Sequence, residues 1–185
     1  GASALAEACL MAKAITKRDK VVLAETINPL YRKVVKTYTS GTDTPLAIVK
    51  SDNGTIDLTE LANKIDEGTA CIAIQHPNFF GNLEDVVEIE KIVHSKGALF
   101  VVDIDPVSLG MLLPPGDYQA DIVVGEGQGL GLPMGMGGPL LGLFATKKEF
   151  IRFVPGRIVG MTVDRDGKRG FVLTLQTREQ HIRRE

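Results

Sequence analysis

Apolar residues along the chain follow two patterns, helical spacing and short continuous runs. Apolar positions three and four apart predict helices over residues 1–15, 28–41, 57–68 and 82–97. Runs rich in small and branched residues predict strands over residues 20–25, 45–51, 69–75, 98–103, 121–126 and 171–176. A further apolar strand is expected between a glycine-rich stretch and Lys147. Helices and strands therefore alternate along most of the chain.

Capping and turn residues indicate where these helices begin and end. Ser3 and Asp57 are suited to the N-cap position, and Pro29 is suited to the first turn of a helix. Gly41 and Gly97 are expected to end the helices that precede them.

The predicted strands are continuous apolar runs, which is typical of strands covered on both faces. With helices between them, they predict a mainly parallel α/β sheet with right-handed crossovers. Ligands in such sheets bind beyond the carboxyl ends of the strands. Those ends are at Glu25, residues 76–78, residues 103–105 and residues 126–129.

Composition fits a globular domain with a real core, because the 185 residues are 44% hydrophobic and 24% charged. No apolar run is long enough to span a membrane. The first residue is Gly1 and the last ten resemble the start of a helix, so we expect an internal piece of a longer chain. Cys9 and Cys71 lie in apolar contexts and are expected to be buried free thiols, in a cytoplasmic, reducing compartment.

The net charge of −2 is unevenly distributed. Residues 147–185 contain ten Lys/Arg and five Asp/Glu (+5), and the remainder contains eleven and eighteen (−7). This asymmetry indicates a contact between the two segments, a basic face for a partner, or an anionic ligand. Nucleic acid is disfavoured because no aromatic residues accompany the basic ones.

Two short motifs are candidates for cofactor chemistry. Ser3 follows Gly1 at a predicted helix start, where a hydroxyl and free N–H groups can bind phosphate; the alternative is an ordinary cap. Asp103 ends a buried strand, where a carboxylate can pair with the ring nitrogen of pyridoxal phosphate; the alternative is a cap for the turn before Pro106.

A glycine-rich loop follows the strand at residues 121–126. Eight glycines fall between Gly125 and Gly142, and no Lys or Arg occurs between Lys96 and Lys147. The spacing does not match a nucleotide-binding GxGxxG motif. Either a cofactor-type loop or a flexible surface loop fits this composition.

The end of the chain carries a basic pattern. Arg178, His181 and Arg184 share a helical face that could bind a carboxylate or a phosphate, and a solvated basic helix is the alternative. His76 and His94 form no metal-ligand spacing, so no metal site is predicted.

Longer segments resemble one family. The stretches "GASALAEA", "HPNFFGNLED", "VVDIDPVSLGMLLPPGDYQADIVVGEGQ", "PGRIVG" and "LQTREQHIRRE" closely resemble the glycine-cleavage-system P-protein, glycine dehydrogenase (decarboxylating). The match is to its half without the catalytic lysine, which in many bacteria and archaea is a separate subunit (subunit 1, or alpha).

The resemblance implies a fold-type-I pyridoxal-phosphate-dependent transferase-like large domain. Its sheet would be of the seven-stranded type, mainly parallel, with helices on both faces. Residues 1–185 would form most of that domain, without the flanking N-terminal region and C-terminal domain. The lysine that forms the Schiff base in this fold would fall near Gln128 or Gly129, and neither side chain can form an imine. Lys147 and Lys148 come too late to substitute.

The implied activity belongs to an assembled enzyme, a glycine dehydrogenase (aminomethyl-transferring). Glycine would be decarboxylated and its aminomethyl group transferred to the lipoyl group of H-protein. A lysine-bearing partner subunit (beta) would bind pyridoxal phosphate covalently. The alternatives are a non-catalytic scaffolding or regulatory subunit of the same complex and a self-sufficient fold-type-I enzyme, which would need the missing lysine.

The resemblance also suggests roles for particular residues. Ser3 and Asp103 would be relics of the phosphate and ring-nitrogen positions. Five further residues are expected to contact an anionic group or the partner chain, or else only to support the fold: Arg157, Gln176, Thr177, Arg178 and His181.

Overall fold

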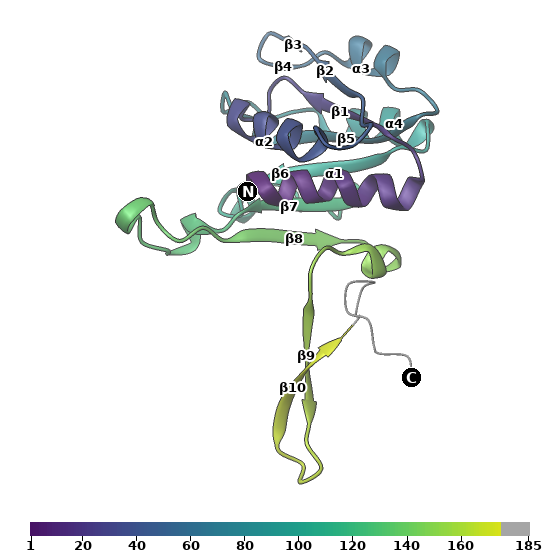
Figure 1. Ribbon diagram of the computed structural model, residues 1–185. Coiled ribbons are helices and arrows are strands. Elements are labelled where there is room, and N and C mark those ends of the chain that lie inside the picture. The colour runs from purple at the N-terminus through teal and green to yellow at the C-terminus, as the bar shows by residue number, and fades with distance from the viewer. Residues whose placement is uncertain (175–185) are drawn as a thin grey trace. The chain divides into compact units, whose positions relative to one another are not determined.

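The chain forms two compact units, Gly1–Thr146 and a second that begins at Lys147. The computed structural model describes residues 1–174 (Figure 1). Each unit is described separately below. Among the described residues, no helix is both long and apolar enough to cross a membrane.

A six-stranded sheet forms the centre of the first unit. Its strands, in the spatial order β2-β1-β5-β6-β7-β8, are β2 Leu46–Val49, β1 Lys20–Ala24, β5 Thr69–His76, β6 Leu99–Ile104, β7 Ile122–Glu126 and β8 Gly142–Thr146. Neighbouring strands are parallel except for β7 and β8, which are antiparallel. The predicted mainly parallel α/β sheet is confirmed. The described sheet has six strands, whereas the resemblance implied a sheet of the seven-stranded type.

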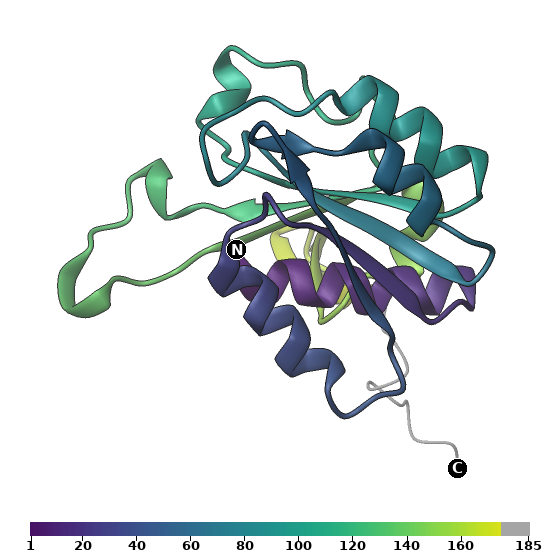
Figure 2. The same ribbon diagram turned by 90° about the horizontal axis from the view of Figure 1, so that it is seen from above.

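Helices cover both faces of this sheet (Figure 2). Helices α1 Ala2–Thr16 and α2 Pro29–Thr39 lie on one face, and α3 Leu58–Lys64 and α4 Val86–Ser95 lie on the other. This double cover explains why the central strands are apolar over most of their length, with polar residues near their ends. Phe100, Leu5 and Ile72 are fully buried, and each such side chain contributes about 1.5–3 kcal/mol to stability.

The two cysteines lie in this core as free, buried thiols, as expected. A hydrogen bond with Cys9 raises the pKa of Cys71, and burial raises it further. The Cys71 thiol is therefore protonated, and the two cysteines pack in the core as small apolar groups.

Three residues predicted to lie at the starts of helices can be compared with the structure. Asp57 caps α3 by accepting hydrogen bonds from Thr59 N and Glu60 N, and Pro29 lies in the first turn of α2, as expected. The prediction for Ser3 as an N-cap is wrong, because α1 begins at Ala2 and its N-cap is Gly1, two residues before Ser3. A side chain at Gly1 would be crowded, since a Cβ there would lie 2.3 Å from the hydroxyl oxygen of Tyr31.

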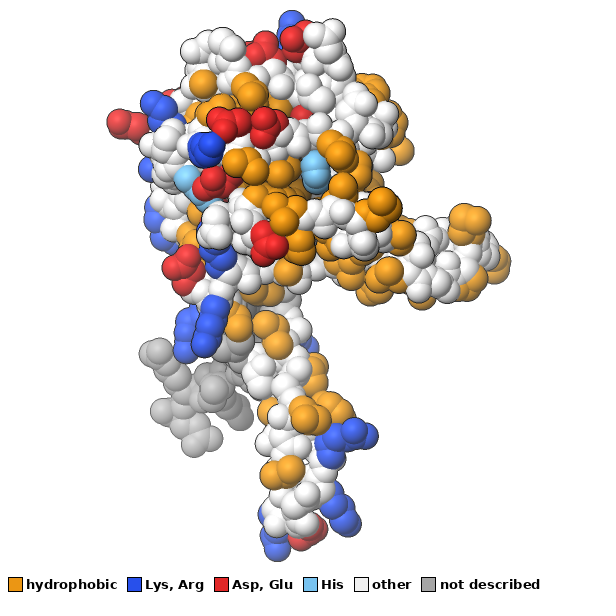
Figure 3. Space-filling view, turned by 180° about the vertical axis from the view of Figure 1, so that it is seen from behind, with side chains coloured by type: hydrophobic (Ala, Val, Ile, Leu, Met, Phe, Trp, Pro, Cys, Tyr) orange, Lys and Arg blue, Asp and Glu red, His pale blue; other side chains and the backbone are white. Residues whose placement is uncertain are grey.

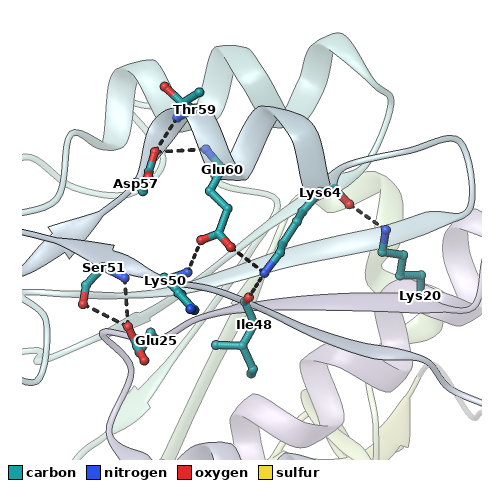
Figure 4. A network of polar contacts seen from close by, with 9 residues as sticks. All are labelled: Lys20, Glu25, Ile48, Lys50, Ser51, Asp57, Thr59, Glu60 and Lys64. Atoms are coloured by element: carbon teal, nitrogen blue, oxygen red, sulfur yellow. Dashed lines mark hydrogen bonds and ion pairs between the residues drawn. The ribbon is translucent and has the colours of Figure 1, made fainter.

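A polar network attaches α3 to the edge strand β2 (Figure 4). Lys64 Nζ donates a hydrogen bond to Ile48 O and forms an ion pair with Glu60 at 2.7 Å. Glu60 in turn accepts a hydrogen bond from Lys50 N. Because Lys64 binds a carbonyl group of the edge strand β2, that group is not free to pair with a strand of another molecule. The short hairpin of β3 Ser51–Asp52 and β4 Thr55–Ile56 follows β2.

The described part of the second unit contains a 3₁₀ segment, Lys148–Phe153, and an antiparallel hairpin of β9 Ile158–Val163 and β10 Arg169–Thr174. The predicted strand at residues 171–176 agrees with β10 up to Thr174, and its last two residues lie outside the described residues. Strand β9 was not predicted. Glycines interrupt its sequence, and its apolar residues are largely exposed, so the pattern of a buried strand is missing.

The close approach of β6 and β7 depends on Gly125. A Cβ at this position would lie 2.5 Å from the backbone oxygen of Ile104, which cannot move aside without disturbing the sheet. We therefore expect Gly125→Ala to lower the free energy of unfolding by about 2 kcal/mol or more, as overpacking does. Gly129→Ala is the control, because its Cβ would only touch Val107 at 3.9 Å. Urea unfolding of both variants tests this, and equal stabilities would contradict it.

Candidate functional site

The carboxyl ends of the central strands bring several polar groups together on the face covered by α1 and α2. Gln75 at the end of β5 is in register with Asp103 at the end of β6. Gln75 Oε1 accepts a hydrogen bond from Asn28 N, at the start of α2, at 2.8 Å. Glu126 ends β7 on the same edge of the sheet. This edge is the position at which ligands bind in parallel α/β sheets.

Asp103 is the unusual group at this edge. Its side chain is buried, and Oδ1 has no hydrogen-bond partner among the described residues. Burial raises the pKa of Asp103 to about 7, and the charge of Glu126 adds to the rise. Asp103 is therefore about half protonated at neutral pH, so it can either donate or accept a hydrogen bond.

Glu126 joins the two ends of the glycine-rich loop through hydrogen bonds. Its Oε1 accepts hydrogen bonds from Gln128 N at 3.1 Å and Leu141 N at 2.8 Å, and Oε2 accepts one from Gly1 N at 2.7 Å. Gly127 N also donates to Leu141 O at 2.6 Å. Desolvation acts to raise the pKa of Glu126, but these hydrogen bonds lower it below the ordinary value, so the carboxylate stays ionised.

The loop itself, residues 127–141, projects from the carboxyl edge of the sheet (Figures 1 and 2). It contains two 3₁₀ turns, Gln128–Leu130 and Gly135–Gly137. Gly131 and Gly138 adopt positive φ angles of 119° and 73°, which explains the need for glycine at these positions. The loop therefore has a defined backbone conformation, and hydrogen bonds join its two ends.

Tyr31 packs between this edge and the start of α1. Its hydroxyl group contacts Gly1 so closely that no side chain fits there. Burial raises the pKa of Tyr31, and the nearby charges of Asp103 and Glu126 raise it further. The sequence pattern does not single out Tyr31, because its role depends on contacts with Gly1, Asp103 and Glu126, which are distant in the chain. Glu126 lies in the segment 126–129 expected at a strand end, but its hydrogen bonds were not predicted.

The residues at this edge do not fit covalently bound pyridoxal phosphate. Gln128 and Gly129, where the resemblance places the lysine, lie in the first 3₁₀ turn of the loop, and neither carries an amine. The start of α1, where a phosphate would bind, faces the carboxylates of Asp103 and Glu126, with no Lys or Arg in residues 97–146. A phosphate dianion would be repelled there. Ser3 is exposed on α1.

His76 and Glu84 belong to a separate polar cluster. His76 comes one residue after Gln75, so it points to the opposite face of the sheet. Its Nδ1 accepts a hydrogen bond from Glu84 N at 3.2 Å, and burial lowers the pKa of His76. The buried Glu84 carboxylate accepts from Thr26 Oγ1 at 2.6 Å and from Asn78 Nδ2 and Ile56 N, both at 2.8 Å. With all these contacts made, the cluster is structural.

The remaining candidates lie in the second unit. Arg157 is exposed directly before β9. Gln176, Thr177, Arg178 and His181 lie outside the described residues. No group of three His, Cys, Asp or Glu side chains able to hold a metal ion occurs within residues 1–174.

The raised pKa of Asp103 makes stability depend on pH. The folded protein holds a proton on Asp103 up to about pH 7, whereas the unfolded chain loses it near 3.8. Wild-type stability therefore falls as pH rises from 4 to 7, by up to about 1.4 kcal/mol per pH unit. We expect Asp103→Asn to remove this fall, so that its stability relative to wild type increases over that range and is constant above it. Urea unfolding at several pH values tests this, with the exposed Asp117→Asn as control; parallel profiles for Asp103→Asn and wild type would contradict it.

Known proteins resemble the whole chain. The family model for the glycine cleavage system P-protein matches residues 1–185. A probable glycine dehydrogenase (decarboxylating) subunit 1 from Carboxydothermus hydrogenoformans is 56% identical over 185 residues. A protein of the same name from Desulforamulus reducens is 55% identical. The alignments cover 100% of this chain and 42% of each relative, so the chain spans less than half of their length.

Solved structures agree with these sequence matches. The crystal structure of a glycine decarboxylase (P-protein) of the glycine cleavage system, in inhibitor-bound form, superposes with a TM-score of 0.88 and 46% identity. The superposition covers 95% of this chain and 39% of that one. The apo structure of a cysteine desulfurase from Thermococcus onnurineus has a TM-score of 0.65 at 23% identity, covering 90% of this chain and 42% of that one, and shows the fold alone. From the family match over its full length, the chain belongs to the glycine cleavage system P-protein family.

Proposed function

We propose that this chain is part of the half of a glycine dehydrogenase (decarboxylating) that lacks the catalytic lysine. The proposed reaction is the decarboxylation of glycine with transfer of the aminomethyl group to the lipoyl group of H-protein. Residues 1–185 would form most of a pyridoxal-phosphate transferase-like large domain. One observation carries the proposal: a member of this family has a well-formed loop after β7 that contains no lysine.

In this proposal a lysine-bearing partner chain binds pyridoxal phosphate covalently. When bound there, the cofactor supplies an electron sink for the carbanion that remains after loss of CO₂. Support comes from the names of the relatives, which identify them as subunit 1 and so imply at least one further chain. The anionic edge formed by Asp103 and Glu126 supports it too, because that edge disfavours a phosphate on this chain. The two free, buried thiols are consistent with a reducing, cytoplasmic compartment.

The basic residues of the second unit are the proposed contribution of this chain to the shared site. Arg157 would contact an anionic group such as the glycine carboxylate, or the partner chain, together with Gln176, Thr177, Arg178 and His181. The net charge of +5 over residues 147–185 supports this assignment. Ser3 and Asp103 would be relics of the phosphate and ring-nitrogen positions.

The alternative of a scaffolding subunit is favoured by the closed base of the loop. Glu126 satisfies the backbone groups at both ends of the loop, so the structure needs no ligand there. The two functions differ in what the basic unit does, because a scaffold would need none of these side chains for turnover.

The position of the cofactor can be mapped directly. Reduction of the assembled enzyme with borohydride would fix the cofactor to its lysine as a stable amine, which mass spectrometry locates. We expect the phosphopyridoxyl group only on the partner chain, because this chain has no lysine between Lys96 and Lys147. Label on Lys147, Lys148 or another lysine of this chain would overturn the proposed function and make the chain a catalyst in its own right.

The contribution of Arg157 can be separated from that of the surrounding basic charge. Loss of a hydrogen bond to an anionic group costs about 1.5–3 kcal/mol, so Arg157→Ala should lower turnover of the assembled enzyme roughly 10- to 100-fold. Arg152→Ala, another exposed arginine of the same unit, is the matched control and should change turnover little. Release of CO₂ from carboxyl-labelled glycine with lipoylated H-protein measures both. Unchanged turnover in Arg157→Ala would favour the scaffold.

A further inference from the structure

We draw no further inference here: the strongest candidate, the patch of exposed apolar side chains on the loop of residues 127–141 (Figure 3), carries nothing, because the chain spans 42% of the length of its relatives and nothing in the structure shows what covers the patch.

Discussion

The hydrogen bonds accepted by the Glu126 carboxylate determine the form of the carboxyl edge. One oxygen receives the N–H groups of Gln128 and Leu141, and the other receives the N atom of Gly1 at the start of α1. Without them, the N–H groups of Gln128 and Leu141 would lose the side chain that joins the two ends of the glycine-rich loop. A carboxylate of this chain therefore occupies a position that would suit a bound anion. The closely spaced ends of the loop follow from it.

Most of the fold could be predicted from the sequence, because burial on both faces leaves a strong signal. The run Thr69–His76 is almost wholly buried and was predicted from its continuous apolar character. Prediction failed where burial does not determine the structure. Strand β9 exposes Val159, Met161 and Val163, so its sequence lacks the pattern of a covered strand. The N-cap of α1 is Gly1, which has no side-chain cap, so the rule that favours Ser3 at this position did not apply.

The candidate site was predictable only in part. The absent lysine and the strand-end carboxylate of Asp103 can be read directly from residue types and positions. Glu126 lies in the segment 126–129 that was expected at a strand end, but its hydrogen bonds with Gly1 and Leu141 could not be predicted. Tyr31 could not be found in this way, since its approach to Asp103 and Glu126 depends on the fold. His76 ends a strand next to Asp103, yet the alternation of side chains along β5 turns it to the other face, where it contacts Glu84. Strand direction can be inferred from sequence patterns. Which face of the sheet the last side chain of a strand points to depends on the register of that strand with its neighbours.

The two neighbouring carboxylates coexist because their surroundings separate their pKa values. Glu126 has three N–H donors and stays ionised, whereas Asp103 has an unpartnered buried oxygen and a pKa of about 7. Near neutral pH Glu126 is therefore ionised, whereas Asp103 can either hold or release its proton. Further burial of this edge would favour the protonated form of Asp103, because desolvation disfavours the charged carboxylate. Protonation of Asp103 would leave Glu126 as the charged member of the pair, so the charge at the end of the sheet responds to what covers it.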